Sequence, residues 1–133
     1  MKQLIDTQII IWILEDNRKL TPKIREIFSN KNNAFWLSKV SLLEIGIKLK
    51  LGKLPNFIVS MEEFIEKINQ SGIKIMQIED RHIAAYQVLP LFDEHRDPFD
   101  RYILATSLSE NMPVISSDER FKLYVPLINL IEA

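Results

Sequence analysis

Residues 95–101, His-Arg-Asp-Pro-Phe-Asp-Arg, place two carboxylates at the expected start of a helix and surround them with cations. Asp97 is a suitable N-cap residue, and Pro98 fits the first helical position because its missing N–H is not needed there. Asp100 follows Asp97 at a spacing of three, so both carboxylates fall on one side, near the positive end of the helix dipole. The same spacing is typical of an ordinary helix cap, so this motif alone does not distinguish a binding site from a structural feature.

Asp6 is the first of three further acids that stand in locally apolar surroundings. It is the only acid before Glu15, and it follows strand-like sequence. Burying a lone carboxylate is costly unless something pairs with it. Asp6 therefore either caps a helix that begins near Thr7 or stands at the carboxyl end of a central parallel strand, where open α/β sheets bind ligands.

Glu44 is the second of these acids, and it lies in an expected helix over residues 40–51. The apolar positions of this helix form a stripe made of Val40, Leu43, Ile47 and Leu51. Glu44 lies between Val40 and Ile47 on the same side of the helix as this stripe, so the pattern predicts an inward-facing carboxylate. Two structural alternatives also fit the spacing: a capping box from Ser41 to Glu44, or a surface ion pair from Glu44 to Lys48.

Asp118 is the third acid, and it comes directly after the apolar segment 113–116. Its position after a short strand matches that of Asp6, and the carboxyl ends of parallel strands gather on one edge of a sheet. The alternative is that Asp118 caps the short turn from Glu119 to Phe121.

The chain as a whole alternates expected strands and helices, which is typical of a parallel α/β sheet. We expect strands at 2–6, 34–37, 73–78, 113–116 and 125–131, and helices at 21–29, 40–51, 60–70, 80–89 and 98–110. The apolar run 9–14 suits either a strand or a buried helix. In the helix over 80–89 we expect Ile83, Ala84 and Val88 to face the core, and His82 to be a surface or packing residue rather than a ligand. The fold class is α/β, with a central, mostly parallel sheet of about five strands flanked by helices.

Composition narrows the possible functions. The 133 residues fit one domain, 1–133, and the net charge of −1 gives no overall attraction to nucleic acid. Any such binding must come from metal ions or from two basic clusters, Lys39, Lys48, Lys50 and Lys53, and Arg96, Arg101, Arg120 and Lys122. The absence of cysteine excludes disulfides and thiolate metal sites. The longest apolar run, residues 9–14, is too short to cross a bilayer, and the chain starts without a signal-like segment, so we expect a cytoplasmic protein with no membrane partner.

The four acids would have a common chemistry if they converged in one cleft. Neighbouring carboxylates repel one another, so such a cluster either takes up protons or holds hard divalent cations. Mg²⁺ and Mn²⁺ prefer oxygen ligands and are often completed by the phosphate oxygens of a substrate. These properties indicate metal-assisted phosphoryl chemistry in which neither histidine needs to act as the base.

Four motifs of this sequence resemble, in the same order, those of PIN-domain ribonuclease toxins of the VapC type. They are Leu4-Ile5-Asp6-Thr7, the segment from Ser41 to Leu54 with Glu44 and Lys48, residues 95–101, and Ser116-Ser117-Asp118 with Phe121. The resemblance spans nearly the whole chain, although the family often has threonine and asparagine where this chain has Ser116 and Ser117. It implies a PIN-like three-layer fold and a metal-dependent endoribonuclease that cleaves RNA, forms a homodimer and is held inactive by a cognate antitoxin.

By position, the resemblance implies that Asp6, Glu44, Asp100 and Asp118 are catalytic residues and ligands of Mg²⁺ or Mn²⁺. Asp97 is a further candidate ligand. We expect the substrate to be contacted by Thr7, Lys48, Arg101 and Ser116.

Two alternatives from other functional classes remain open. A phosphatase or receiver domain, which transfers phosphoryl groups, also carries an aspartate after its first strand. However, Asp6-Thr7-Gln8 lacks the second aspartate of the phosphatase pattern, and no lysine follows the late strand. The other alternative is a binding partner in a complex that performs no catalysis. Incubating the purified protein with RNA and either Mg²⁺ or a chelator separates these possibilities.

Overall fold

A five-stranded, all-parallel sheet forms the centre of the protein in the computed structural model, which describes residues 1–133. The strands are β1 (Lys2–Ile5), β2 (Ala34–Ser38), β3 (Lys74–Met76), β4 (Val114–Ser116) and β5 (Leu130–Glu132). Their spatial order is β3-β2-β1-β4-β5, so the strand order reverses at the central pair β1 and β4. Open α/β sheets bind ligands outside the carboxyl ends of the strands at such a reversal.

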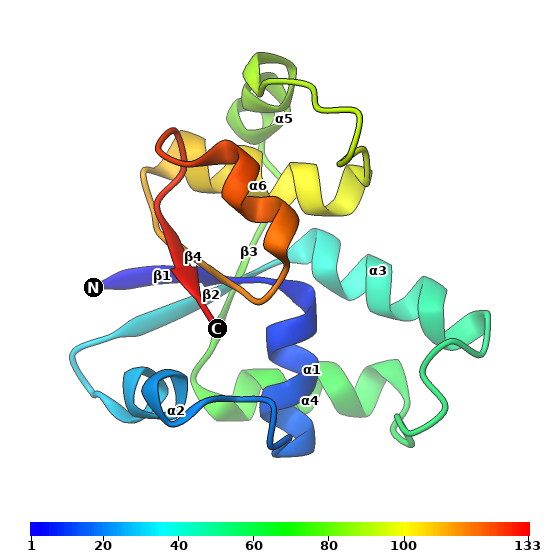
Figure 1. Ribbon diagram of the computed structural model, residues 1–133. Coiled ribbons are helices and arrows are strands. Elements are labelled where there is room, and N and C mark those ends of the chain that lie inside the picture. Colours follow the sequence, from blue (N-terminus) through cyan, green and yellow to red (C-terminus); the bar gives the residue numbers. More distant parts are fainter.

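Helices cover both faces of this sheet, which confirms the expected three-layer α/β architecture (Figure 1). The helices are α1 (Thr7–Glu15), α2 (Pro22–Ser29), α3 (Lys39–Lys50), α4 (Met61–Ser71), α5 (Asp80–Val88) and α6 (Pro98–Glu110), with a 3₁₀ helix η1 (Glu119–Tyr124). Helices α1, α2 and α4 lie on one side of the sheet, and α5 and α6 lie on the other.

The central strands supply residues to both hydrophobic cores because successive side chains of a strand point to opposite faces. In β1, Leu4 belongs to the core beneath α6, whereas Ile5 belongs to the core beneath α1 and α4. Val114 and Ile115 of β4 divide in the same way. All four side chains are fully buried, and each such burial contributes roughly 1.5–3 kcal/mol. The carboxyl ends of β1 and β4 are therefore held rigidly side by side.

Most expected element starts are confirmed, and each has a local cause. The hydroxyl of Thr21 accepts a hydrogen bond from the backbone N–H of Ile24 at the start of α2, and Ser60 does the same for Glu63 at the start of α4. The ambiguous run 9–14 is helical and forms most of α1. No helix of the structure combines the length and the apolar character that crossing a membrane requires.

Two expected strands are shorter in the structure. The third strand covers only Lys74–Met76, and the last only Leu130–Glu132. The expected strand over 125–131 was wrong for its first half because η1 continues to Tyr124 and Ile128 then donates its backbone N–H to the Tyr124 carbonyl. Residues 125–129 therefore form a turn that returns the chain to the sheet edge.

The expected inward face was partly wrong in α3, where Val40 and Glu44 are buried as predicted, and wrong in α5. In α3, Leu43, Ile47 and Leu51 of the apolar stripe are exposed, Leu43 by 56%, and the buried residues are Val40, Ser41, Leu42, Glu44 and Ile45. The reason is that α3 runs away from the end of the sheet and packs against α1 and α6 rather than across a sheet face (Figure 1).

Helix α5 shows the same kind of difference. Ile83, Ala84 and Val88 face solvent, whereas His82 and Leu89 are buried. Helix α5 packs against α6, and His82 lies in this contact with its ring edge to face with that of Tyr102. The interpretation of His82 as a packing residue is confirmed.

Candidate metal-binding and catalytic site

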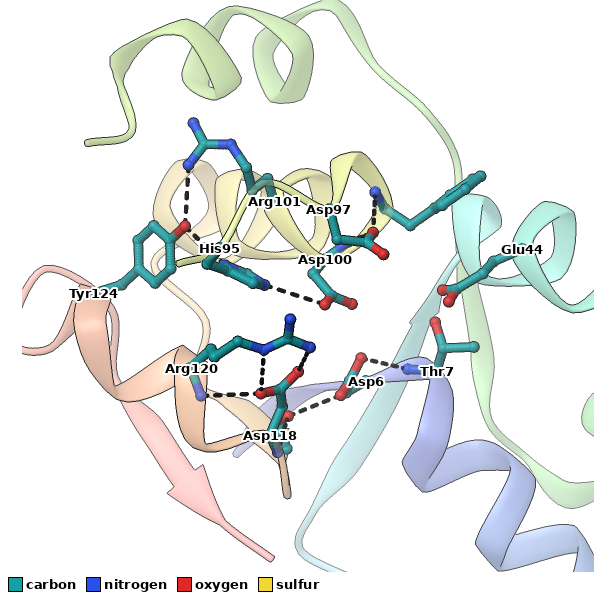
Figure 2. Close-up of polar contacts among 12 residues, drawn as sticks. Asp6, Thr7, Glu44, His95, Asp97, Asp100, Arg101, Asp118, Arg120 and Tyr124 are labelled. Atoms are coloured by element: carbon teal, nitrogen blue, oxygen red, sulfur yellow. Dashed lines mark hydrogen bonds and ion pairs between the residues drawn. The ribbon is translucent and has the colours of Figure 1, made fainter. Parts of the chain in front are cut away.

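A polar cleft of about 340 Å³ lies beyond the carboxyl ends of β1 and β4. No hydrophobic residue lines it, and its walls are formed by Asp6, Thr7, Gln8, Glu44, Lys48, Asp97, Asp100, Ser117, Asp118 and Arg120. The structure thus brings together all five acids that were predicted for the site, from the ends of two strands and from two helices (Figure 2).

Asp6 occupies both of the positions that its sequence allowed. It directly follows β1, and its side chain caps α1 by accepting a hydrogen bond from the backbone N–H of Thr7 at 2.7 Å. Its other oxygen accepts a hydrogen bond from the Ser116 hydroxyl at 2.8 Å. Burial, followed by the negative charge of Asp100, raises the pKa of Asp6 to about 7. A carboxyl group held in this way gains stability from a nearby cation.

Glu44 reaches the cleft from α3. Its Oε2 pairs with Nζ of Lys48 at 3.0 Å, so the expected ion pair is present, although the carboxylate is buried rather than on the surface. The alternative of a capping box from Ser41 was wrong, because Ser38 caps α3 and the Ser41 hydroxyl instead accepts a hydrogen bond from Thr7. The buried Oε1 of Glu44 has no hydrogen-bond partner. An unpartnered carboxylate oxygen in an acidic cleft is a natural ligand for a cation.

Asp97 and Asp100 have different environments at the start of α6. Asp97 is exposed, and one of its oxygens caps the helix by accepting hydrogen bonds from the backbone N–H groups of Phe99 and Asp100 at 2.9 and 3.1 Å. Asp100 instead lies 3.1 Å from Nε2 of the buried His95. Burial raises the pKa of Asp100 to about 6; the His95 hydrogen bond opposes this rise, and the charges of Asp97 and Glu44 add to it.

Asp118 follows β4 and also caps η1, so both of its predicted positions are observed. Its carboxylate accepts the backbone N–H of Arg120 at 2.9 Å and is paired by the Arg120 guanidinium at 3.1 and 2.8 Å. Burial tends to raise the pKa of Asp118, but the Arg120 hydrogen bonds and charge outweigh it and hold the pKa below its usual range.

Two of the four expected substrate contacts lie outside the cleft. Arg101 is buried behind Asp100, where its guanidinium donates to the Pro90 carbonyl at 2.9 Å and to the Tyr124 hydroxyl at 3.0 Å. Consecutive helical residues point about 100° apart, so Arg101 faces the protein interior when Asp100 faces the cleft. Ser116 is also buried, and its hydroxyl orients Asp6.

Thr7 and Lys48, the other two expected substrate contacts, do line the cleft. Two residues were missed as members of the site. Arg120 was noted only as part of a basic cluster, and His95 received no role although it begins the motif 95–101. His95 Nε2 and carboxylate oxygens of Asp100 and Asp118 lie within 4.8 Å of one another. The available signal was the position of His95 five residues before Asp100, a spacing that becomes a contact only when the turn before α6 folds back.

The residues of the cleft fit Mg²⁺ or Mn²⁺. The available donors are carboxylate oxygens, which these ions prefer. Two further observations agree: the Glu44 oxygen is unpartnered, and the pKa values of Asp6 and Asp100 are raised to about 7 and about 6. Asp6, Glu44, Asp100 and Asp118 are the residues that would hold such an ion, and Asp97 stands at the rim with one oxygen committed to its cap.

The fold and the cleft define a parallel α/β domain with an acidic cleft at the reversal of its strand order. The profile of the PIN domain matches residues 4–125, and the chain belongs to this family. No curated protein matches the sequence.

Several solved structures share this fold at low sequence identity. A chain of VapBC2 from Rickettsia felis, crystallised with a DNA fragment from their promoter, matches with a TM-score of 0.70 and 18% identity over 99% of this chain and 98% of that one. A chain of DNA-bound VapBC from Salmonella typhimurium matches with a TM-score of 0.69 and 17% identity over the same shares of the two chains. A chain of VapBC-1 from nontypeable Haemophilus influenzae matches with a TM-score of 0.66 and 19% identity, again over 99% of this chain and 98% of that one.

Proposed function

We propose that this protein is a metal-dependent endoribonuclease that hydrolyses RNA phosphodiester bonds with Mg²⁺ or Mn²⁺ held by Asp6, Glu44, Asp100 and Asp118. The observation that carries this proposal is the convergence of these four acids, from four separate segments, on one cleft without an apolar wall. Placing carboxylates together raises their energy in the absence of cations, so such an arrangement supports cation binding.

The residues of the chain have distinct roles in this proposal. When bound, the cation activates a water and stabilises charge on the leaving oxygen. Thr7 and Ser116 orient the two oxygens of Asp6 through hydrogen bonds of 2.7 and 2.8 Å. Because these hydrogen bonds come from buried groups, Asp6 is already arranged for a ligand before one arrives.

Lys48 and Arg120 are the cations of the cleft, and both suit a nucleic-acid backbone. In the structure they neutralise Glu44 and Asp118 at 3.0 and 2.8 Å. Lys48 offers a point charge and Arg120 a planar fork that matches phosphate oxygens. We propose that these two residues, with Thr7, contact the substrate. Arg120, rather than Arg101 as the sequence suggested, would then be the arginine that binds the substrate. We propose RNA rather than DNA as the substrate because the four motifs resemble those of VapC-type ribonuclease toxins.

We further propose that the protein is the toxin of a toxin–antitoxin pair and forms a homodimer. The fold shared with chains of VapBC structures supports the toxin role. The surface also carries an apolar groove of about 340 Å³, which Leu14, Phe57, Ile58, Val59 and Phe64 line beside α1 and α4. Such a groove suits an apolar segment of an antitoxin. Co-expression with the neighbouring gene product should suppress activity, and light scattering should give twice the chain mass; a monomer at all concentrations contradicts the dimer.

The test of the nuclease proposal is cleavage of a fluorescent single-stranded RNA by the purified protein. We expect cleavage with Mg²⁺ or Mn²⁺, loss in excess chelator, and recovery when the metal is restored. A DNA strand of the same sequence should be cut much less. Glu44→Gln should reduce cleavage on the order of 100-fold, because the metal contributes several kcal/mol and each 1.36 kcal/mol is tenfold in rate.

Glu62→Gln is the matched control, since Glu62 lies in the first turn of α4 and outside the cleft. Undiminished cleavage in chelator contradicts the metal-dependent mechanism. Cation binding without cleavage of either nucleic acid favours the alternative of a binding partner without catalytic activity.

A further inference from the structure

Three side chains form a hydrogen-bonded series behind Asp100, on the side away from the cleft (Figure 2). Nη1 of Arg101 lies 3.0 Å from the Tyr124 hydroxyl, which lies 2.9 Å from Nδ1 of His95. Nε2 of His95 then lies 3.1 Å from Oδ2 of Asp100. Arg101, Tyr124 and His95 are all at least 96% buried, with exposed fractions of 4%, 2% and 0%. Bulk solvent therefore does not compete for the hydrogen bonds of these groups.

The direction of the hydrogen bonds follows from the chemistry of the two ends. A guanidinium has donors and no acceptor, so Arg101 donates to the Tyr124 oxygen. The hydroxyl hydrogen of Tyr124 then has Nδ1 of His95 as its partner, so Nδ1 accepts. In a neutral imidazole the other nitrogen carries the hydrogen, and Nε2 of His95 therefore donates to the Asp100 carboxylate.

The opposite direction is costly at both ends of the imidazole. If His95 donated through Nδ1, the Tyr124 oxygen would accept two hydrogen bonds and its own hydrogen would be buried without a partner, which is destabilising. The lone pair of Nε2 would also face the Asp100 carboxylate oxygen at 3.1 Å. Arg101 is itself held in place by the Pro90 carbonyl and by the ring of Tyr86, whose centroid lies 5.1 Å from the guanidinium carbon. The first donor of the series therefore has a fixed position.

We propose that Arg101, Tyr124 and His95 form a directed hydrogen-bond series that orients Asp100, and that His95 is a positioning residue rather than a metal ligand. This inference rests on the proposed function, because it takes Asp100 to be a ligand of the cation. The alternative is direct ligation by His95, since its Nε2 lies within 4.8 Å of carboxylate oxygens of Asp100 and Asp118. A nitrogen that carries a hydrogen has no lone pair for a metal, so the Asp100 carboxylate, whose Oδ1 is not engaged by His95, is the group that would bind the cation.

The proposal also explains the motif 95–101. Asp97 caps α6, Asp100 enters the cleft, and His95 and Arg101 both contact the Tyr124 hydroxyl. A motif whose charged residues all bound RNA would leave Tyr124 without these partners.

The first test is NMR of the histidine ring nitrogens in the metal-free protein, in a His82→Gln background that leaves His95 as the only histidine. At about pH 8, where a histidine is ordinarily neutral, we expect the hydrogen on Nε2. Tyr124→Phe removes the hydroxyl that donates to Nδ1, and it should change this spectrum. A hydrogen on Nδ1 in the parent, or an Nδ1 chemical shift that is unaffected by Tyr124→Phe, overturns the directed series.

The second test uses Mn²⁺ binding without RNA. Pulsed EPR of the Mn²⁺ complex should show no coupling to a histidine nitrogen, and such a coupling overturns the assignment of His95 as a positioning residue. His95→Gln places an amide N–H near the position of Nε2, whereas His95→Asn reaches only the position of Nδ1. We expect His95→Asn to weaken Mn²⁺ binding by about 10-fold to 100-fold and His95→Gln to restore most of it.

Equal binding by the parent protein, His95→Gln and His95→Asn overturns the proposal, because a residue that only fills space would behave in this way. The outcomes also separate the two proposals. If RNA is not cleaved while the tautomer and the Mn²⁺ series are as expected, the endoribonuclease assignment fails and the positioning role holds. If the parent binds no Mn²⁺, the assignment of Asp100 as a ligand fails with the proposed function.

Discussion

Helix α6 carries a carboxylate beside a buried histidine at each of its ends. At its start, Asp100 lies 3.1 Å from His95. At its end, Glu110 lies 3.3 Å from His82. Both histidines are fully buried, and the second nitrogen of each faces a tyrosine hydroxyl, at 2.9 Å for His95 and 3.4 Å for His82. The two regions therefore share one pattern of contacts: in each, a carboxylate oxygen lies beside Nε2 of a histidine and a tyrosine hydroxyl lies beside its Nδ1.

The pKa values of the two carboxylates are shifted in opposite directions. Arg81, through its hydrogen bonds and charge, lowers the pKa of Glu110. At the other end, burial and the charges of Asp97 and Glu44 raise the pKa of Asp100 to about 6. Glu110 thus has a cation of the chain as its partner, whereas Asp100 stands among other acids.

The helix dipole alone would shift the two pKa values the other way, lowering that of Asp100 and raising that of Glu110. It favours negative charge at the start of a helix and disfavours it at the end, by about 0.3–1 kcal/mol at exposed positions. Raising the pKa of Asp100 from 3.8 to about 6 corresponds to roughly 3 kcal/mol. Burial and neighbouring charges therefore outweigh the dipole. The same contact between a histidine and a carboxylate thus occurs with and without neighbouring acids, and the cluster of acids, rather than this contact, distinguishes the cleft from the other end of α6.

The largest expected effect is on RNA cleavage. Asp100→Asn keeps the size of the side chain and removes the charge, so we expect it to abolish cleavage, with a loss on the order of 100-fold or more. Glu110→Gln, the matched change at the other end of α6, should leave cleavage within about twofold of the parent because it lies outside the cleft. Initial rates at saturating Mg²⁺ measure both variants. Equal losses would show that the comparison between the two ends is wrong.

Thermal stability should separate the same two variants in the other direction. Without metal, Asp100→Asn relieves repulsion among the acids, so its melting temperature should hold or rise. Glu110→Gln breaks the contacts with Arg81 and His82 and should cost about 1 kcal/mol. Adding Mg²⁺ should raise the melting temperature of the parent protein and of Glu110→Gln, and Asp100→Asn should lose most of this rise. A full Mg²⁺ shift in Asp100→Asn would mean that the acid is structural.

Two raised pKa values should make metal-free stability depend on pH: a smaller contribution comes from Asp100, with a pKa of about 6, and the larger one comes from Asp6. Its pKa is about 7 in the folded protein against an ordinary value of 3.8, so between these values the folded state binds more protons than the unfolded state. Stability should therefore fall as the pH rises from about 4 to about 7, by up to ~1.4 kcal/mol for each pH unit.

Asp6→Asn is the variant that isolates this effect. Denaturant unfolding at about pH 5 and about pH 7.5, in chelator, should show a smaller fall for Asp6→Asn than for the parent. A parent protein that becomes more stable over this range would contradict the raised pKa of Asp6.

The smallest expected effect concerns the helix cap. Asp97→Ala removes the acceptor for the backbone N–H groups of Phe99 and Asp100, and it should cost roughly 1 kcal/mol of stability. Asp97→Asn caps nearly as well and should be close to neutral. If Asp97 is only a cap, Asp97→Asn also keeps the Mg²⁺ shift in melting temperature; loss of that shift would make Asp97 a metal ligand.

The sequence alone was sufficient for features that depend on near neighbours. The caps at Thr21, Ser60 and Asp97 involve contacts within three residues, so their spacing in the sequence is also their spacing in space. The positions of Asp6 and Asp118 after apolar strands were also readable, because parallel strands bring their carboxyl ends to one edge. The α/β class and the five acids of the cleft followed from these local patterns together with the PIN-like motifs.

Only the tertiary structure decided which way several side chains face. The apolar residues of α3 and α5 have helical spacing in any environment, but which of them are buried depends on where each helix packs. The contact of His95 with Tyr124 joins residues 29 apart, and that of Asp6 with Ser116 joins residues 110 apart. Arg101 was expected at the substrate and instead lies behind Asp100, because a buried tyrosine hydroxyl and a carbonyl bind its guanidinium from inside. Such partners come from distant segments, and the periodicity of one segment carries no information about them.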